Sequence, residues 1–164
     1  AGSRGSIIPF WAELVKRGQK NLPLTDLRMT RFWITLDEAV DLVIKGFEIA
    51  KGSEIVVPKI PSFKIVDLLD ALSPNSKPDI IGIREGEKIH ELMIPSDDAR
   101  HTLEFDDHYL IIPEATIHNA KLLTKFLNGR SGKTLVDGFS YTSGTNDQWL
   151  NPEKLKELVK PYLY

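Results

Sequence analysis

The chain has 164 residues, about the length of one domain, and 41% of them are hydrophobic, enough for a packed core. Its 21 Lys and Arg residues nearly balance 23 Asp and Glu residues, so the net charge of −2 provides no basic field for a nucleic acid. The chain has no cysteine, which excludes disulfides and thiolate sites and is typical of a reducing cytoplasm. Its apolar runs are too short to span a bilayer, so we expect a cytoplasmic globular protein with no nucleic-acid or membrane partner.

The first residues carry neither an initiator Met nor an apolar signal core, so we expect residue 1 to be the point at which a longer chain was cut. A helix is predicted at 6–17, because Pro9 is tolerated in a first turn and Gly18 is a suitable stop. A short extended segment follows at 22–25.

The clearest predicted element is a helix over 35–50. Thr35 and Glu38 have the spacing of a capping box, in which each side chain bonds a backbone N–H of the first turn. The apolar residues behind them fall at helical spacing: Leu36, Ala39, Val40, Val43, Ile44 and Phe47. We therefore expect this helix to pack one face on a sheet.

A strand at 54–59, a helix at 62–72 and an Ile-rich strand at 79–84 come next. This alternation predicts an α/β fold with a largely parallel sheet that contains both strands. Further on, we expect a strand at 108–112, a helix at 117–127 and mostly loop at 129–147. A last helix should begin with Asn151 as N-cap and Pro152 at its first position.

Two short motifs fail on inspection. The sequence at 132–134 ends like a P-loop, but Leu127 stands where the pattern requires glycine. His90 and Glu91 begin like a zincin helix, but Ile94 occupies the position of the second histidine. Neither a nucleoside-triphosphate loop nor a zincin site is predicted.

A polar cluster near the middle of the chain has metal-ligand chemistry without metal-ligand spacing. Its members are His101, Asp106, Asp107 and His108. Carboxylates and imidazoles this close together in a polar loop are usually solvated, so we expect no metal.

Arginines mark two segments, 28–33 and 84–87. Each segment follows a predicted strand, and ligands gather at such positions in α/β sheets. A guanidinium presents a rigid fork of donors that matches phosphate oxygens, so two of them can clamp a diphosphate. Spacing alone equally allows an ordinary surface salt bridge at each position.

Several long segments, in the same order, are similar to the inverting UDP-N-acetylglucosamine 4,6-dehydratases, which are extended short-chain dehydrogenase/reductases. They are GSRGSIIPF at 2–10, TDLRMTRFWITLDE at 25–38, VPKIPS at 57–62, GIREGEKIHE at 82–91, LEFDDH at 103–108 and NDQWL at 146–150. The resemblance covers essentially the whole chain. It implies that residues 1–164 are the substrate-binding carboxy-terminal half of such an enzyme: an incomplete NAD(P)-binding Rossmann sheet plus a substrate-binding α/β subdomain, without the amino-terminal Rossmann half.

The resemblance also implies an activity. Such a lyase oxidises C4 of the sugar with NADP, eliminates water across C5 and C6, and returns the hydride to C6 with inversion at C5. This reaction belongs to the synthesis of 6-deoxy amino sugars, such as pseudaminic acid, for surface or flagellar glycans. The catalytic Tyr and Lys and the glycine-rich cofactor motif of the family have no counterpart in this chain, so we expect it to hold no catalytic residue and no NADP.

Substrate contacts carry over residue by residue from related UDP-sugar enzymes. The family pattern assigns Arg31 and Arg84 to the diphosphate and Glu87 to the ribose hydroxyls. The backbone at Leu24 and Thr25 is assigned to the uracil, and Ser3, Arg4 and Ser6 to the sugar end. Glu85 departs from the pattern, since relatives usually carry Pro there, and it places an extra carboxylate beside Arg84.

Two alternatives remain open. One is a free-standing nucleotide-sugar-binding or interaction module without catalysis, and the other is a related enzyme of the same superfamily, either a retaining dehydratase or a UDP-sugar epimerase. Because the Rossmann half is missing, we also expect the apolar sides of the helices at 6–17 and 35–50 to be uncovered. That surface predicts a homo-oligomer through Ile7, Ile8, Trp11 and Leu14, or a disordered amino-terminal segment.

Overall fold

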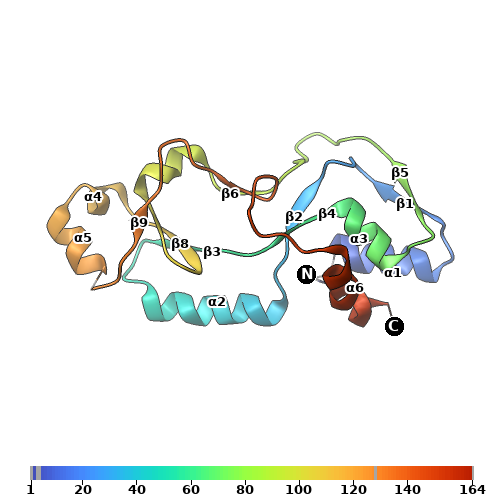
Figure 1. Cartoon of the computed structure of the whole chain (residues 1–164), viewed down its shortest axis with the longest axis horizontal. Coiled ribbons are helices and arrows are strands. Elements are labelled where there is room, and N and C mark those ends of the chain that lie inside the picture. The colour runs from blue at the N-terminus through green and yellow to red at the C-terminus, as the bar shows by residue number, and fades with distance from the viewer. Residues whose placement is uncertain (1, 3–4, 128, 164) are drawn as a thin grey trace. The chain divides into compact units, whose positions relative to one another are not determined.

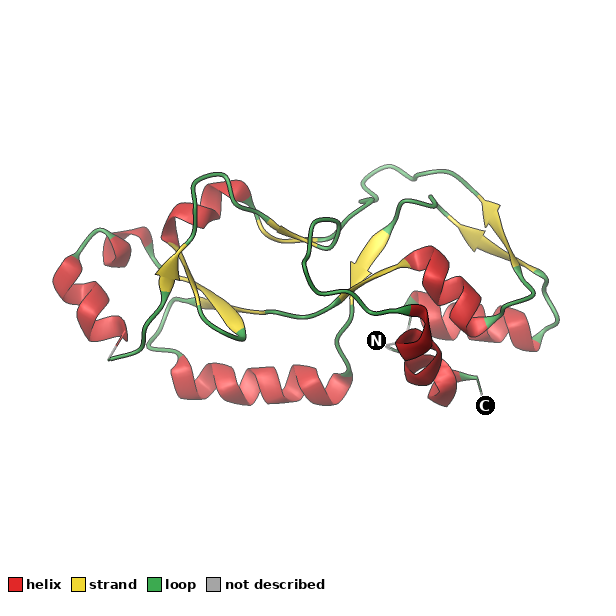
Figure 2. Ribbon diagram, viewed as in Figure 1, coloured by secondary structure: helices red, strands yellow, loops and turns green. Residues whose placement is uncertain are grey.

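The computed structural model describes residues 2, 5–127 and 129–163, and the chain forms two compact units. Unit 1 comprises Ala1–Leu36, Ile60–Glu91 and Ser143–Tyr164, and unit 2 comprises Asp37–Lys59 and Leu92–Thr142. Figures 1 and 2 show that both units mix helices and strands. The α/β fold predicted from the sequence is confirmed.

Unit 1 contains four strands and three α-helices among its described residues. In chain order these are α1 (Ile7–Lys16), β1 (Asn21–Leu24), β2 (Thr30–Phe32), β4 (Ser62–Lys64), α3 (Ile65–Leu72), β5 (Lys77–Ile80) and α6 (Pro152–Val159), followed by the 3₁₀ turn η2 (Lys160–Tyr162). Strands β1 and β5 pair in parallel, from Asn21 opposite Lys77 to Leu24 opposite Ile80. Strands β2 and β4 pair antiparallel.

The core of unit 1 covers the side of α1 that the sequence predicted to be exposed. Ile8 and Trp11 are buried, and Ile7 and Leu14 pack against the same cluster. The indole Nε1 of Trp11 donates a hydrogen bond to the Pro23 carbonyl at 3.0 Å. Association through these four side chains is therefore wrong as a prediction, because α3, α6 and β1 supply the apolar partners within the chain.

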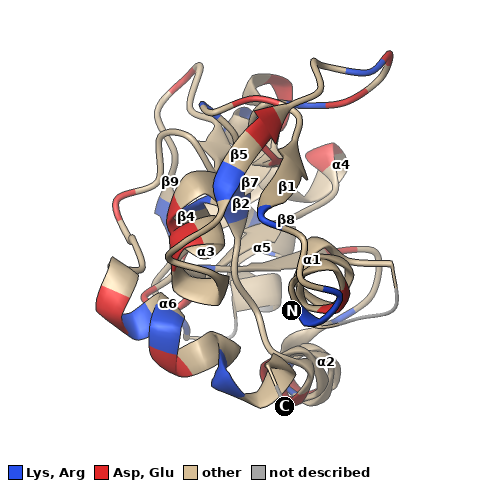
Figure 3. Cartoon of the chain, turned by 90° about the vertical axis from the view of Figure 1, so that its right-hand side faces the viewer, with Lys and Arg blue, Asp and Glu red and all other residues tan. Residues whose placement is uncertain are grey.

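Helix α6 closes this core from the carboxy-terminal end. The Asn151 side chain accepts a hydrogen bond from the Lys154 N–H at 2.8 Å, which confirms the predicted N-cap. Leu155 and Val159 are fully buried, whereas both basic and acidic residues lie along the exposed side of the helix (Figure 3). One apolar stripe therefore fixes the orientation of α6.

Unit 2 is built on a four-stranded antiparallel sheet. Its elements are α2 (Leu36–Ile49), β3 (Ile55–Pro58), β6 (Leu92–Ile94), the 3₁₀ helix η1 (Ser96–His101), β7 (Thr102–Glu104), β8 (His108–Ile111), α4 (Glu114–Ile117), α5 (Ala120–Leu127), β9 (Lys133–Thr134) and β10 (Tyr141–Thr142). The strand order is β3-β8-β7-β9, and β6 pairs with β10. Leu103, Leu110 and Ile112 form its core with side chains of α4 and α5.

The prediction of one largely parallel sheet is wrong. The strand expected at 54–59 is β3, which pairs antiparallel with β8 in unit 2. The strand expected at 79–84 is β5, which ends at Ile80 and pairs in parallel with β1 in unit 1. The tight turn between β7 and β8 makes a hairpin, and hairpin strands are antiparallel.

Helix α2 has nearly the predicted bounds, but the expectation that it packs on a sheet is wrong for this chain. None of its residues is buried, and Val43 and Phe47 are 58% and 84% exposed. The sheet of unit 2 is packed instead by apolar side chains of α4 and α5, such as Ile117 and Leu123. The apolar stripe of α2 is thus uncovered in the described part of the chain.

Smaller differences from the predictions are local. The helix expected at 62–72 begins as β4 before α3, and the helix expected at 117–127 divides into α4 and α5. Asn119 separates the two, because its side chain accepts from the N–H groups of Lys121 and Leu122 at 3.1 Å. Residues 129–147 are mostly loop, as predicted. No helix in the described residues is long and apolar enough to cross a membrane.

Candidate functional site

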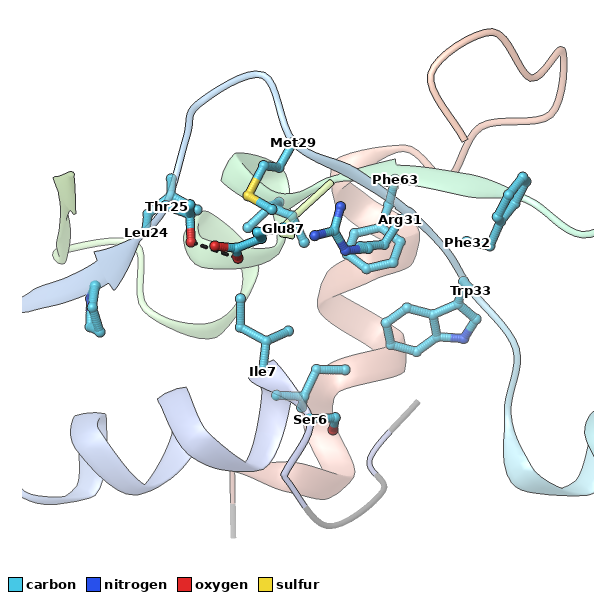
Figure 4. A pocket seen from close by; sticks show the side chains of 13 residues that line it. Ser6, Ile7, Leu24, Thr25, Met29, Arg31, Phe32, Trp33, Phe63 and Glu87 are labelled. Carbon is cyan, nitrogen blue, oxygen red and sulfur yellow. Dashed lines mark hydrogen bonds between the residues drawn. The ribbon is translucent and has the colours of Figure 1, made fainter. Parts of the chain in front are cut away.

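A cavity of about 380 Å³ opens in unit 1 between the start of α1, the end of β1 and strand β2 (Figure 4). Its lining mixes apolar walls with a few polar groups, as is usual for small-molecule sites. The lining residues are Ser6, Ile7, Ile8, Pro23, Leu24, Thr25, Met29, Arg31, Phe32, Trp33, Phe63, Ile65 and Glu87.

The amino terminus of α1 forms one wall of this cavity. Ser6 is its N-cap in an extended conformation, and its side chain makes no capping hydrogen bond. The first-turn N–H groups of Ile7 and Ile8 have no partner within the helix, and Pro9 has no N–H. The amino terminus of this ten-residue helix carries the positive end of the helix dipole, which favours an anion at this wall of the cavity.

Glu87 supplies the carboxylate of the cavity and is held from two segments. The Thr25 hydroxyl donates to its Oε1 at 2.9 Å, and the Arg84 backbone N–H donates to its Oε2 at 3.3 Å. Figure 4 shows the Thr25–Glu87 bond beside Leu24, where β1 ends. An oriented carboxylate of this kind accepts hydrogen bonds from a diol.

Arg31 comes from β2, and its guanidinium is largely committed to the protein. Nη1 donates to the Thr30 and Ile89 carbonyls at 2.7 and 3.0 Å, and Nη2 donates to the Lys88 carbonyl at 3.1 Å. Nε lies 3.1 Å from Oε1 of Glu91. These contacts use four of the five N–H donors of a guanidinium and leave one on Nη2 for a ligand.

The structure brings together most of the residues that the sequence predicted for a site. Ser6, Leu24, Thr25, Arg31 and Glu87 all line the cavity. Arg84 does not line it and is exposed, so the expected convergence of its guanidinium with that of Arg31 stays a prediction. Ser3 and Arg4 lie outside the described residues.

Sequence reasoning missed the apolar wall of the cavity. Met29, Trp33, Phe63 and Ile65 line it and also belong to the unit 1 core. Trp33 and Phe63 meet edge to face with ring centroids 5.5 Å apart. In the sequence, only the aromatic residues directly after Arg31, Phe32 and Trp33, indicated this wall.

Arg28, the other arginine of its segment, makes the ordinary surface pair that the sequence left open. Its guanidinium bonds both carboxylate oxygens of Asp26, at 3.0 and 2.8 Å. The hydrogen bonds from Arg28 lower the pKa of Asp26 to about 2. Arg28 is absent from the cavity lining.

Both histidines of the polar cluster at 101–108 pair with a nearby carboxylate. His108 Nδ1 lies 2.7 Å from Asp107, and His101 Nε2 lies 3.2 Å from Asp98. Across residues 2, 5–127 and 129–163, no group of three ligating side chains is arranged to hold a metal ion.

The described residues do not fit the NADP that the resemblance implies for the parent enzyme. A dinucleotide site needs a parallel strand that leads through a glycine-rich turn into a helix. Here β1 leads through residues 25–29 into strand β2, and β5 leads through residues 81–91 into strand β6. No described segment therefore offers the cradle for a pyrophosphate of that cofactor.

Comparison with known proteins shows the family of the chain. The sequence model of the polysaccharide biosynthesis protein family matches residues 1–113. The chain belongs to the polysaccharide biosynthesis protein family. It is 46% identical over 159 residues to "UDP-N-acetylglucosamine 4,6-dehydratase (inverting)" of Campylobacter jejuni, covering 96% of this chain and 48% of that relative. The resemblance stated from the sequence is thereby confirmed.

Two further family comparisons are weaker but equally extensive. A protein named UDP-glucose 4-epimerase in Rickettsia canadensis is 36% identical over 162 residues, which are 96% of this chain and 46% of that protein. The X-ray structure of Pen from Bacillus thuringiensis superposes with a TM-score of 0.77 at 29% identity, covering 96% of this chain and 46% of Pen. This polysaccharide biosynthesis family chain thus spans about half the length of the relatives it matches.

Proposed function

We propose that this chain is the substrate-binding half of an inverting UDP-N-acetylglucosamine 4,6-dehydratase, and that the cavity of unit 1 receives the nucleotide sugar. The observation that carries the proposal is the pairing, in one cavity, of an uncapped helix terminus with an oriented carboxylate at Glu87. The first suits a diphosphate and the second suits a ribose. The 46% identity to a protein of that name supports the substrate.

Each part of the ligand has a matching part of the wall. The backbone at Leu24 and Thr25 faces the uracil edge, and Glu87 accepts from the ribose hydroxyls. The N–H groups that begin α1, together with the open Nη2 donor of Arg31, meet the diphosphate, and Arg84 approaches it from its loop. Ser6 lies at the sugar end.

The chemistry of the parent lyase then belongs to residues beyond this chain. In the parent, the residues that would hold NADP, and with it the redox chemistry of the reaction, would lie outside these 164 residues. This chain binds and orients the substrate, and by itself turns nothing over. The cysteine-free composition supports a cytoplasmic location for the reaction.

Helix α2 supports this division of the parent protein. Leu36, Val40, Val43, Ile44 and Phe47 are between 50% and 84% exposed. A contiguous apolar stripe of this kind marks an interface, and the relatives contain about as much chain again as this one. The amino-terminal half of the parent covers this stripe, and in its absence the chain associates through it.

A UDP-sugar epimerase is the second candidate, favoured by the Rickettsia relative. It would use the same cavity for the same nucleotide, since uracil, ribose and diphosphate are common to both substrates. The lower identity, 36% against 46%, places it behind the dehydratase.

A titration of the isotope-labelled chain with UDP-N-acetylglucosamine, UDP and GDP tests the binding proposal. We expect the amide resonances of Ile7, Ile8, Thr25 and Glu87 to shift with both uridine ligands, with GDP binding more weakly. Glu87→Gln should weaken binding about tenfold, the value of one hydrogen bond to a charged group. Glu85→Gln is the matched control on the same loop, and uniform or absent shifts would contradict the proposal.

A second assay addresses catalysis. The purified chain with NADP and UDP-N-acetylglucosamine should form no 4-keto sugar above background. Turnover by these 164 residues alone would exclude the division of labour proposed above.

A further inference from the structure

The segment from Lys88 to Glu91, directly after Glu87, has no regular secondary structure. It is held instead by backbone and side-chain groups of β2 and of Ser143. The Thr30 N–H donates to the Ile89 carbonyl at 3.0 Å, and the Ser143 N–H donates to the Glu91 carbonyl at 2.9 Å. Because Glu87 lies one residue before this segment, its position in the cavity depends on these contacts.

Two buried hydroxyls extend this network to His90. Thr30 and Ser143 are 5% and 0% exposed. The Thr30 Oγ1 lies 2.8 Å from His90 Nδ1 and 2.7 Å from Ser143 Oγ. Ser143 Oγ also lies 3.1 Å from the Thr30 carbonyl and accepts from the Glu91 N–H at 2.9 Å.

The number of available hydrogens determines which group donates in each hydrogen bond of this network. A carbonyl only accepts, so the single Ser143 hydroxyl hydrogen goes to the Thr30 carbonyl. The contact between the two hydroxyls must then use the hydrogen of Thr30, which makes Thr30 Oγ1 an acceptor toward His90. All four bonds form together only when His90 carries a proton on Nδ1.

We propose that His90, as the Nδ1–H tautomer, is a positioning residue: it completes this hydrogen-bond network and so fixes Glu87 in the cavity. The imidazole packs directly against Gly144, where any larger residue would clash, since a Cβ at Gly144 would lie 2.7 Å from His90 Cγ and Nδ1. The tautomer follows from the condition that all four contacts are hydrogen bonds at the same time. Its consequence for a ligand rests on the nucleotide-sugar binding proposed above.

The tautomer is measured directly by long-range ¹H–¹⁵N correlation of the imidazoles at about pH 8.5, where an ordinary histidine is neutral. His90 should show a pyrrole-type Nδ1 and a pyridine-type Nε2, with the resonance assigned by its loss in His90→Asn. Thr30→Val removes the acceptor and should release this preference. An Nε2–H tautomer in the unsubstituted chain would overturn the inference.

A pair of substitutions tests the positioning role. The amide nitrogen of Asn stands two bonds from Cβ, as Nδ1 does in histidine, so His90→Asn should restore the donor that His90→Leu removes. We expect His90→Leu to lower the exchange protection of the Glu91 and Ser143 amides, and the affinity for UDP, by about fivefold, the value of one neutral hydrogen bond. His90→Asn should keep both close to the original values.

These readouts separate the two proposals. Equal protection of both amides in His90→Leu and the unsubstituted chain would exclude the positioning role. Absence of UDP binding in the unsubstituted chain would exclude the proposed function, while the tautomer and exchange measurements would still decide the role of His90.

Discussion

Thr25 and Glu87 lie 62 residues apart in the sequence, and the Thr25 hydroxyl donates to the Glu87 carboxylate at 2.9 Å (Figure 4). This bond ties the loop after β5 to the end of β1, and these two strands pair in parallel. Thr25 therefore orients the one carboxylate among the described residues that line the cavity.

Replacing Thr25 by Val keeps the shape of the side chain and removes its hydroxyl. We expect the affinity for UDP to fall about fivefold to tenfold, because Glu87 loses the donor that orients it. Thr25→Ser retains the hydroxyl and should bind within about twofold of the unsubstituted chain. Calorimetric titration of the three chains decides the matter, and an unaffected Thr25→Val would show that Glu87 needs no such support.

Substitution of Arg31 should mainly affect the stability of the fold, whereas substitution of Arg84 should mainly affect UDP binding. Arg31→Lys loses the fork that holds the Lys88 and Ile89 carbonyls, and should lower the free energy of unfolding by roughly 1–3 kcal/mol. Arg84 is exposed, so Arg84→Lys should weaken UDP binding and leave stability within about 0.5 kcal/mol. Urea unfolding and calorimetric titration of both variants compare the two effects; equal stability losses would contradict this distinction.

Local signals made much of the fold predictable. The Asn151–Pro152 start of α6 and the bounds of α2 depend on a few neighbouring residues, and both are confirmed within one or two positions. Sheet assignment depends on pairing across the chain. A β-branched run such as that of β3 does not indicate whether the neighbouring strand is parallel or antiparallel. The prediction of one largely parallel sheet was therefore wrong.

The candidate site divides in the same way. The family pattern indicated Ser6, Thr25, Arg31 and Glu87, and the structure gathers them at one cavity. It did not indicate that Arg31 spends most of its donors on backbone carbonyls, or that Ser143 joins Thr30 and His90. Apart from the bond of Arg31 to the neighbouring Thr30 carbonyl, those contacts join positions more than fifty residues apart, which spacing in a sequence does not encode.

Two glycines offer opposite outcomes on substitution by Ala. Gly46 lies inside α2 with nothing within 4 Å of an added Cβ, so Gly46→Ala should stabilise the helix by roughly 0.5–1 kcal/mol. A Cβ at Gly144 would lie 2.7 Å from the His90 ring, so Gly144→Ala should displace that ring and weaken UDP binding. Thermal unfolding and titration of the two variants test the contrast, and a stabilising Gly144→Ala would contradict the packing described here.

Asp107 gives unit 2 a dependence on acidic pH. A hydrogen bond from Lys45 on α2, and a second from His108, lower the pKa of Asp107 to about 2. A carboxyl with a depressed pKa stabilises the fold above its unfolded pKa of about 4 and loses that effect as the pH falls toward 2. Because Asp107 is 65% exposed, the stabilisation should stay below about 1 kcal/mol.

Urea unfolding of the unsubstituted chain and of Asp107→Asn between pH 7 and pH 2 measures this effect. The difference in unfolding free energy should be constant above about pH 5 and vanish toward pH 2. Asp106→Asn, in the same turn, is the control for the loss of one negative charge. A difference that persists at the acid end would assign the effect to packing instead of charge.

Phe47 tests the proposal that α2 is an interface within a longer protein. Its side chain is 84% exposed, so Phe47→Gln should change the unfolding free energy of this chain by less than about 0.5 kcal/mol. The same substitution should reduce the binding of a hydrophobic dye and any concentration-dependent self-association, because it interrupts the apolar stripe. Leu68→Ala, at a fully buried position, is the control and should cost about 2–5 kcal/mol.

In a protein of the length of the relatives, Phe47→Gln should instead be destabilising by roughly 1–3 kcal/mol, since a covered Phe loses its burial. Equal and small effects in the short and the long protein would show that α2 faces solvent in both, and would remove the main structural support for the missing half.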